Sequence, residues 1–166
     1  PFIKGHYHPF PSAVMMKRDL FLEQGGFSTD FSGNGHEDVE FWARLCQVTD
    51  FHFIEEPLVQ YRYDNERPWS ESQAKKYWFN NTLLLHNKLK ALYNKDPSMK
   101  KALKRILQME STQQSFLGKQ FLQQGNVGEA RRRFQYAWKA QKNWKNFSRM
   151  TRASLPEPCW KWLFSE

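Results

Sequence analysis

The apolar residues of this chain change their spacing near residue 70, and this change constrains the fold more than any other feature. Before it, apolar runs are short and are separated by Gly or Pro; after it, apolar residues recur every three to four positions. The first pattern predicts short strands mixed with helices, and the second predicts helices alone. We therefore expect an α/β part over residues 1–70 and an all-α part over residues 71–166.

The expected elements of the first part are brief. Apolar runs predict strands at residues 12–16, 51–54 and 58–63. Helical spacing predicts helices over residues 17–24 and 37–48. A polar stretch around Pro68 then marks the boundary with the second part.

The second part should contain a helix over residues 73–93 and another from about residue 98, because Pro97 cannot continue the first. Residues 111–144 match one tetratricopeptide repeat, whose usual length is about 34 residues. The matching positions are Leu117, Gly118, Phe121, Ala130, Phe134 and Ala137, whereas Gln114 and Lys142 depart from the pattern. Since a solenoid needs roughly three such repeats, this pair is expected to pack on its neighbours.

The two parts carry opposite charge. Residues 1–70 hold six Lys or Arg and eleven Asp or Glu, a net charge of −5, whereas residues 71–166 hold nineteen and six, a net charge of +13. The basic part suits anionic lipid, nucleic acid or an acidic partner. Such a run of charges is usually only a solvated face. The chain has no recognised nucleic-acid motif, and basic residues 131–133 lie near Trp138, Trp144, Trp160 and Trp162, so an anionic membrane surface ranks above nucleic acid as a partner.

The cysteines, Cys46 and Cys159, have neither a paired framework nor metal spacing, and they indicate reduced thiols in a cytoplasmic protein. No apolar run approaches the ~18 residues of a membrane span, so any membrane contact is expected to be peripheral, at the inner face. The absence of an initial Met indicates a fragment or a processed chain. His6, His8 and His36 have no regular spacing to a third ligand, which argues against a histidine metal site.

A glycine-rich loop leads into two adjacent carboxylates at the start of the predicted helix 37–48. Gly33 and Gly35 allow close backbone approach to a ligand. Glu37 and Asp38 lie in the first turn, where the helix dipole favours their ionised forms. Such a carboxylate can take a proton from a hydroxyl, although an acidic first turn taken alone more often serves only the dipole.

Four segments give this loop its context: residues 12–18 (SAVMMKR), 25–27 (GGF), 35–45 (GHEDVEFWARL) and 56–62 (EPLVQYR). In this order and spacing they resemble the C-terminal half of a family 2 glycosyltransferase catalytic domain. The helical remainder is similar to accessory regions that follow such domains in some bacterial enzymes. The resemblance implies an incomplete GT-A half-domain of short strands and helices.

The resemblance also implies an activity, the inverting transfer of a sugar from a nucleotide-sugar donor to an acceptor hydroxyl. The acceptor would be a sugar, a lipid-linked molecule or a protein, as in the synthesis of cell-surface polysaccharide. Asp38 is implied as the general base, and Glu37 as a residue that orients the loop or binds the acceptor. Gly35, His36 and Arg62 are implied as substrate contacts.

The family's divalent metal, Mg²⁺ or Mn²⁺, is expected in the intact enzyme. Asp64 stands where the family often has a His, and its oxygens make it a candidate ligand. The family's Asp-x-Asp metal motif occurs nowhere in the chain, and no βαβ unit precedes residue 12. We therefore expect the nucleotide-binding half to be missing and the chain alone to be inactive.

Two other readings of the sequence remain open. The basic helical part could itself be the functional unit, either as a helical protein-interaction module or as a basic module that binds a membrane surface. Arg44 also has a structural reading beside a phosphate contact, because it lies four residues after Glu40 on the predicted helix and can pair with it.

Overall fold

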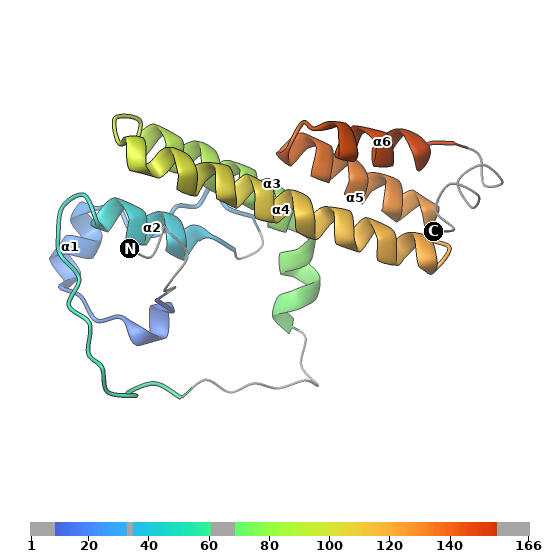
Figure 1. Ribbon diagram of the computed structural model, residues 1–166. Coiled ribbons are helices and arrows are strands. Elements are labelled where there is room, and N and C mark those ends of the chain that lie inside the picture. Colours follow the sequence, from blue (N-terminus) through green and yellow to red (C-terminus); the bar gives the residue numbers. More distant parts are fainter. Residues whose placement is uncertain (1–8, 33–34, 61–68, 156–166) are drawn as a thin grey trace. The chain divides into compact units, whose positions relative to one another are not determined.

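The computed structural model describes residues 9–32, 35–60 and 69–155, with side chains from residue 77 onward in the last range. The elements are the 3₁₀-helix η2 (Pro11–Ala13) and the α-helices α1 (Arg18–Glu23), α2 (Glu37–Leu45), α3 (Trp69–Leu92), α4 (Pro97–Gln123), α5 (Val127–Ala140) and α6 (Trp144–Arg152) (Figure 1). The chain divides into two compact units, Pro1–Leu103 and Lys104–Glu166. None of the described helices has an apolar stretch long enough to cross a bilayer.

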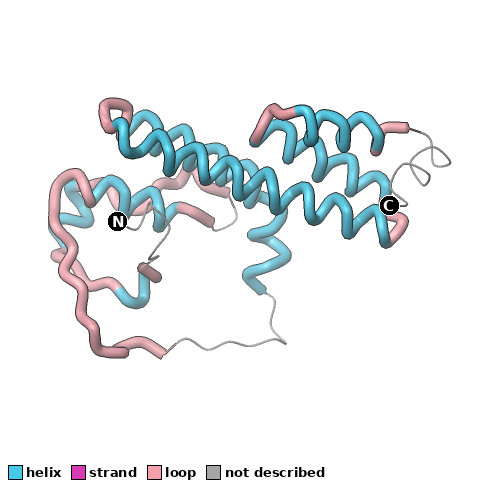
Figure 2. The backbone as a smooth tube through the Cα atoms, viewed as in Figure 1, coloured by secondary structure: helices cyan, strands magenta, loops and turns pink. Residues whose placement is uncertain are grey.

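The expected α/β architecture of residues 1–70, with its GT-A half-domain of short strands, is wrong for the residues that the structure describes. They form helices and loops, with no strand among them (Figure 2). The helices expected over residues 17–24 and 37–48 are confirmed as α1 and α2. A strand requires a neighbouring chain with which to share its backbone hydrogen bonds, and the described residues provide none for these apolar runs.

Residues 51–60 show the consequence of lacking a partner strand. They form an exposed loop in place of the strands expected at 51–54 and 58–63, of which residues 61–63 lie outside the described ranges. Phe53 is 80% exposed and Leu58 is 67% exposed. An apolar run thus identifies residues suited to a sheet, but it does not supply the sheet.

The first run, 12–16, begins inside η2, and only its residues 14–16 alternate in the side they face, without forming a strand. Val14 and Met16 pack on the core residues of α2, whereas Met15 is 98% exposed. Residues on alternate sides of an extended chain face opposite directions, and this local property does not depend on pairing. The run therefore anchors the segment before α1 to the core.

The core of the first unit is built on one face of α2. Phe41 and Leu45, four residues apart, are at most 2% exposed, as is Trp42 beside them. Phe21 of α1 meets the Phe41 ring edge-on at 5.2 Å between centroids. The turn after α1 fits closely around the Phe21 ring. Gly26 in this turn has a positive φ of 63°, and a Cβ there would lie 2.9 Å from that ring.

Three helices begin with a side chain that accepts a backbone N–H. Asp96, Asn126 and Asn143 accept from residues two or three positions later, at 2.8, 3.2 and 2.9 Å. These caps satisfy donors that have no partner within the helix. They explain why α4, α5 and α6 begin where they do.

Close packing of α4 against α5 in the second unit depends on Gly118. An added Cβ at this position would lie 2.7 Å from the ring of Phe134, which is fully buried. Phe134 joins Leu122, Ala130 and Ala153 in one core cluster. This packing agrees with the helix pair predicted for residues 111–144. The identity of these residues as a tetratricopeptide-like repeat stays a prediction.

A buried amide fastens α6 to the other two helices of this unit. Asn146, which is 3% exposed, donates through Nδ2 to Ser111 Oγ at 2.8 Å. The same nitrogen lies 3.1 Å from the Ala137 carbonyl oxygen and 2.8 Å from that of Gln141, while Ser115 donates to Asn146 Oδ1 at 3.3 Å. Since buried polar groups are costly without partners, these bonds fix the position of α6.

We expect Gly118→Ala to lower the free energy of unfolding by about 1–3 kcal/mol, because the new methyl group overpacks a full core. Urea denaturation followed by circular dichroism measures this loss. Gly128→Ala in α5 is the matched control, since a Cβ there meets nothing within 4 Å. It should be neutral or stabilising by up to about 1 kcal/mol, because Ala is the better helix former; equal losses in the two variants would contradict the packing account.

Candidate functional site

The two adjacent carboxylates lie half-buried at the start of α2 and have different partners. Glu37 Oε2 accepts the Gly35 N–H at 2.6 Å, so Glu37 closes the loop in front of the helix. Asp38 Oδ1 accepts the Val39 N–H at 2.7 Å, whereas Oδ2 makes no hydrogen bond or ion pair with the described residues. His36, between Gly35 and Glu37, has a left-handed φ of 75°. Such a conformation in a residue other than Gly is uncommon and is often found at functional sites.

A helix distant in sequence holds this loop in place. Asn81 of α3 is 4% exposed and accepts the Ser32 N–H at 3.3 Å through Oδ1. Its Nδ2 donates to the Ser32 carbonyl at 2.8 Å and to the Gly35 carbonyl at 3.1 Å. One amide therefore holds both residues that flank positions 33–34, directly before the carboxylates.

The same helix fixes the ring of His36. Its Nε2 lies 2.9 Å from Thr82 Oγ1, and its ring centroid lies 4.3 Å from that of Trp78. Thr82 is buried and also donates to the Trp78 carbonyl at 2.9 Å. His36 thus combines an unusual backbone conformation with a side chain that Trp78 and Thr82 of α3 hold in place.

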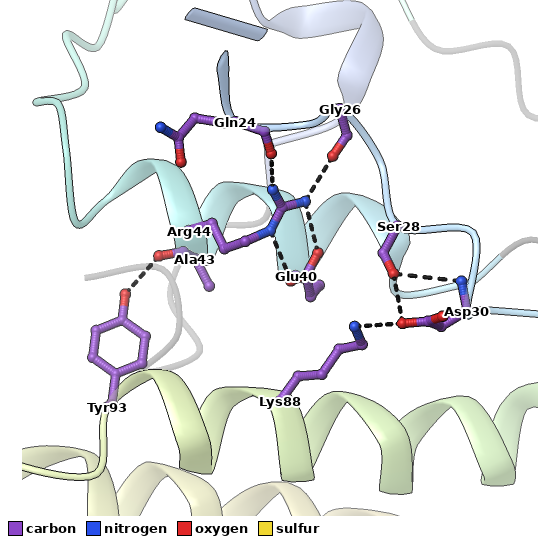
Figure 3. Close-up of polar contacts among 9 residues, drawn as sticks. All are labelled: Gln24, Gly26, Ser28, Asp30, Glu40, Ala43, Arg44, Lys88 and Tyr93. Carbon is purple, nitrogen blue, oxygen red and sulfur yellow. Dashed lines mark hydrogen bonds and ion pairs between the residues drawn. The ribbon is translucent and has the colours of Figure 1, made fainter. Parts of the chain in front are cut away.

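Two further contacts join Lys88 of α3, and Tyr93 directly after α3, to the residues around α2 (Figure 3). Lys88 Nζ lies 2.7 Å from Asp30 Oδ2, and Ser28 Oγ donates to the same carboxylate at 3.2 Å. Tyr93 donates its hydroxyl proton to the Ala43 carbonyl of α2 at 2.9 Å. Burial raises the pKa of Tyr93, which favours the neutral phenol that this bond requires.

Arg44 joins α2 to the turn after α1 (Figure 3). Its Nε donates to Glu40 Oε1 at 2.8 Å and its Nη2 to Glu40 Oε2 at 3.0 Å, as the four-residue spacing predicts. Nη2 also donates to the Gly26 carbonyl at 2.6 Å, and Nη1 donates to that of Gln24. The Glu40 side chain is 8% exposed and that of Arg44 is 23% exposed. The structural reading of Arg44 is therefore confirmed.

Four of the expected site residues, Gly35, His36, Glu37 and Asp38, are consecutive in the sequence and lie at the N-terminus of α2, so their roles stay predictions. Arg62 and Asp64 lie outside the described residues, so their roles remain predictions. His6 and His8 also lie outside these residues.

Sequence reasoning missed the α3 residues that hold the loop: Trp78, Asn81 and Thr82. A signal for one of them was present. Asn81 lies four residues before Leu85 and eight before Leu89, at a position where the apolar stripe of this helix would continue. A polar residue in such a stripe must find partners when it is buried.

The described residues do not form a cage for the divalent metal that the resemblance implies. No group of three or more His, Cys, Asp or Glu side chains within the described ranges could hold an ion. Glu37 and Asp38 each use an oxygen to accept a backbone N–H. We therefore assign no step to a metal through these residues.

We expect the Asp30–Lys88 pair to depend on pH. The hydrogen bond from Lys88, followed by that from Ser28, lowers the pKa of Asp30 from its ordinary value of 3.8. A lowered pKa in the folded state means that the pair adds stability above pH 3.8, and that this stability is lost as the pH falls through the lowered value. NMR titration of Lys88→Met should show the Asp30 pKa rising towards 3.8; an unchanged pKa would contradict the pairing.

We expect Asn81→Asp to lower the free energy of unfolding by about 1–3 kcal/mol, because two backbone carbonyls lose their donor in a buried place. Thermal unfolding measures the loss. The adjacent Asn80→Asp is the matched control, since Asn80 is exposed on the same helix and the substitution adds the same charge. If both variants unfold like the parent protein, Asn81 does not hold the loop.

Comparison with known proteins gives one match. A family model described as "Glycosyltransferase like family 2" matches residues 2–150, which is most of the chain. The matched range includes both the carboxylates at the start of α2 and the α3 residues that hold their loop. No curated protein and no solved structure matches the chain.

Proposed function

Since the chain belongs to glycosyltransferase-like family 2, we propose that it takes part in the transfer of a sugar from a nucleotide-sugar donor to an acceptor hydroxyl, with Asp38 as general base. The acceptor would be a sugar, a lipid-linked molecule or a protein. The residues described around α2 would form the acceptor side of the site. The donor side would require residues beyond these, because the chain contains no Asp-x-Asp.

In the proposed step, the acceptor oxygen attacks the anomeric carbon from the face opposite the nucleotide. The new carbon–oxygen bond forms as the bond from that carbon to the diphosphate oxygen breaks, and the nucleoside diphosphate leaves with the electron pair. The acceptor proton passes to Asp38. The configuration at the anomeric carbon is therefore inverted.

The proposed assignment of Asp38, rather than Glu37, as the base rests on the different partners of the two carboxylates. Glu37 closes its own loop by accepting the Gly35 N–H, which suits a residue that positions the loop. Asp38 is held through Oδ1, so its second oxygen is the better candidate to meet a hydroxyl. Asp38 lies in the first turn of α2, directly after the loop that Glu37 closes.

The neighbouring residues would shape the acceptor side. At Gly35 a Cβ would lie 3.5 Å from Asn81 Nδ2, so the backbone here packs closely on α3, and the ring of His36 is held by Thr82 and Trp78 in a fixed place beside it. We propose both as acceptor contacts. We propose Arg62 as a further substrate contact and Asp64 as a candidate ligand for Mg²⁺ or Mn²⁺.

The test is a donor screen with the full-length protein. Release of nucleoside diphosphate would be measured for a panel of nucleotide sugars and candidate acceptors, and NMR would assign the product's anomeric configuration. We expect turnover of at least one donor with inversion. A product of retained configuration would contradict the direct attack that Asp38 is proposed to assist.

A further inference from the structure

The second unit has a basic exterior with little acidic charge to oppose it. Described residues 104–155 contain eleven Lys or Arg and two Asp or Glu. Glu110 is 4% exposed and accepts a bond from Gln114 at 2.7 Å, so it lies in the interior. Glu129 pairs with Arg132 at 3.0 Å and with Arg133 at 2.8 Å. Both carboxylates are therefore already engaged, and the remaining surface charge is positive.

Helix α6 has a buried side and an outward side. Asn146 and Ala153 are buried, and Met150 packs on the core cluster, so these residues define the inner side. At 100° per residue, the opposite side is centred between Trp144 and Arg152. Trp144 is 79% exposed, which agrees with this placement.

Large aromatic side chains gather at the start of this outward side. The Phe147 ring lies 5.6 Å from that of Trp144 and 5.5 Å from that of Trp138 on α5, between centroids. Phe147 is itself 36% exposed. Figure 1 shows α5 and α6 side by side, consistent with this contact. Exposed Trp and Phe together mark a surface that meets an apolar or amphipathic partner.

We propose that the outward face of α6, formed by Trp144, Lys145, Phe147 and Arg152, binds the surface of an anionic lipid bilayer. Trp and Phe enter the boundary between headgroups and acyl chains, while Lys145 and Arg152 meet lipid phosphates. This contact is separate from the proposed sugar transfer, since none of its residues belongs to the site at α2. It makes the second unit a peripheral membrane anchor.

Charge and aromatic content together favour a bilayer over a nucleic-acid duplex. Both partners would meet the Lys and Arg side chains. A bilayer also provides an apolar layer for the neighbouring Trp144 and Phe147, whereas a duplex presents a row of phosphates and has no such layer. Substituting the aromatic residues therefore distinguishes binding to a bilayer from binding to a duplex in an experiment.

The test is sedimentation of the full-length protein with large unilamellar vesicles, using phosphatidylglycerol mixed with phosphatidylcholine and, separately, phosphatidylcholine alone. We expect binding to the anionic vesicles that weakens with added salt and little binding to the neutral ones. Lys145→Gln with Arg152→Gln should weaken binding roughly 25-fold, at about fivefold for each charge removed near the surface. Trp144→Ser should weaken it about tenfold at unchanged charge.

A matched control is Lys100→Gln with Lys101→Gln, which removes the same charge from exposed positions in the first unit. It should retain binding within about twofold, and circular dichroism confirms that each variant is folded. Equal losses in the two charge pairs would show attraction by total charge alone and would overturn the assignment to α6. Binding to a DNA duplex without binding to anionic vesicles would overturn the proposal as a whole.

Discussion

Replacing Asp38 by Asn should lower the turnover of sugar transfer by about 10²–10⁴-fold, the range that a positioned general base contributes. The amide retains the size of the side chain and an oxygen that can accept the Val39 N–H, so the start of α2 should persist. What is lost is the ability to take the acceptor's proton. The measurement is the rate of nucleoside diphosphate release at saturating donor and acceptor, with thermal unfolding as a check on folding.

Glu37→Gln is the matched control for this prediction, because it removes the adjacent charge by the same chemical change. The Gln oxygen can still accept the Gly35 N–H, which is the role that the structure gives to Glu37. We expect a loss of less than about tenfold, well below that of a missing base. If the two variants reversed these effects, Glu37 would be the base and Asp38 the residue that supports the loop.

Replacing Arg44 by Met should lower the free energy of unfolding by about 3 kcal/mol, the lower end of the range for breaking a buried ion pair. The loss is large because Glu40 would retain a carboxylate at 8% side-chain exposure without its cation. The carbonyls of Gln24 and Gly26 would lose their donor as well. Urea denaturation of the variant measures the change.

The double variant Glu40→Leu with Arg44→Met distinguishes the loss of the ion pair from the cost of leaving Glu40 without its cation. It should be more stable than Arg44→Met alone, because no unpaired carboxylate remains in the core. Arg18→Met, at an exposed position on α1, controls for the loss of one positive charge and should have an effect within about 0.5 kcal/mol. If the double variant were less stable than the single variant, the cost would not come from an orphaned charge.

The sequence predicted the features of this fold that depend on near neighbours. The start of α2 follows from an acidic first turn and an apolar face, and the Glu40–Arg44 pair follows from its four-residue spacing. The close approach at Gly118 likewise follows from a small residue facing large ones. The start of α2 and the Glu40–Arg44 pair need no knowledge of distant contacts, whereas Gly118 meets Phe134 of the following helix.

The predicted strands were wrong because strand formation depends on residues that are distant in the sequence. Residues 12–16 and 51–54 have the composition of strands, but whether such a run forms one depends on a hydrogen-bonding partner elsewhere in the chain. The role of Asn81 is similarly remote, since it lies 49 positions from Ser32. Its place in the apolar stripe of α3 could show that it is buried, but only the folded chain shows which loop it holds.

A structure of the full-length protein with an acceptor and an inert donor analogue tests the central claim most directly, because it places the reacting hydroxyl. The account predicts the acceptor oxygen within hydrogen-bond reach of Asp38, about 2.6–3.2 Å from a carboxylate oxygen. Glu37 should still accept the Gly35 N–H in that complex. An acceptor hydroxyl bound by a different carboxylate, with Asp38 out of reach, would contradict the assignment.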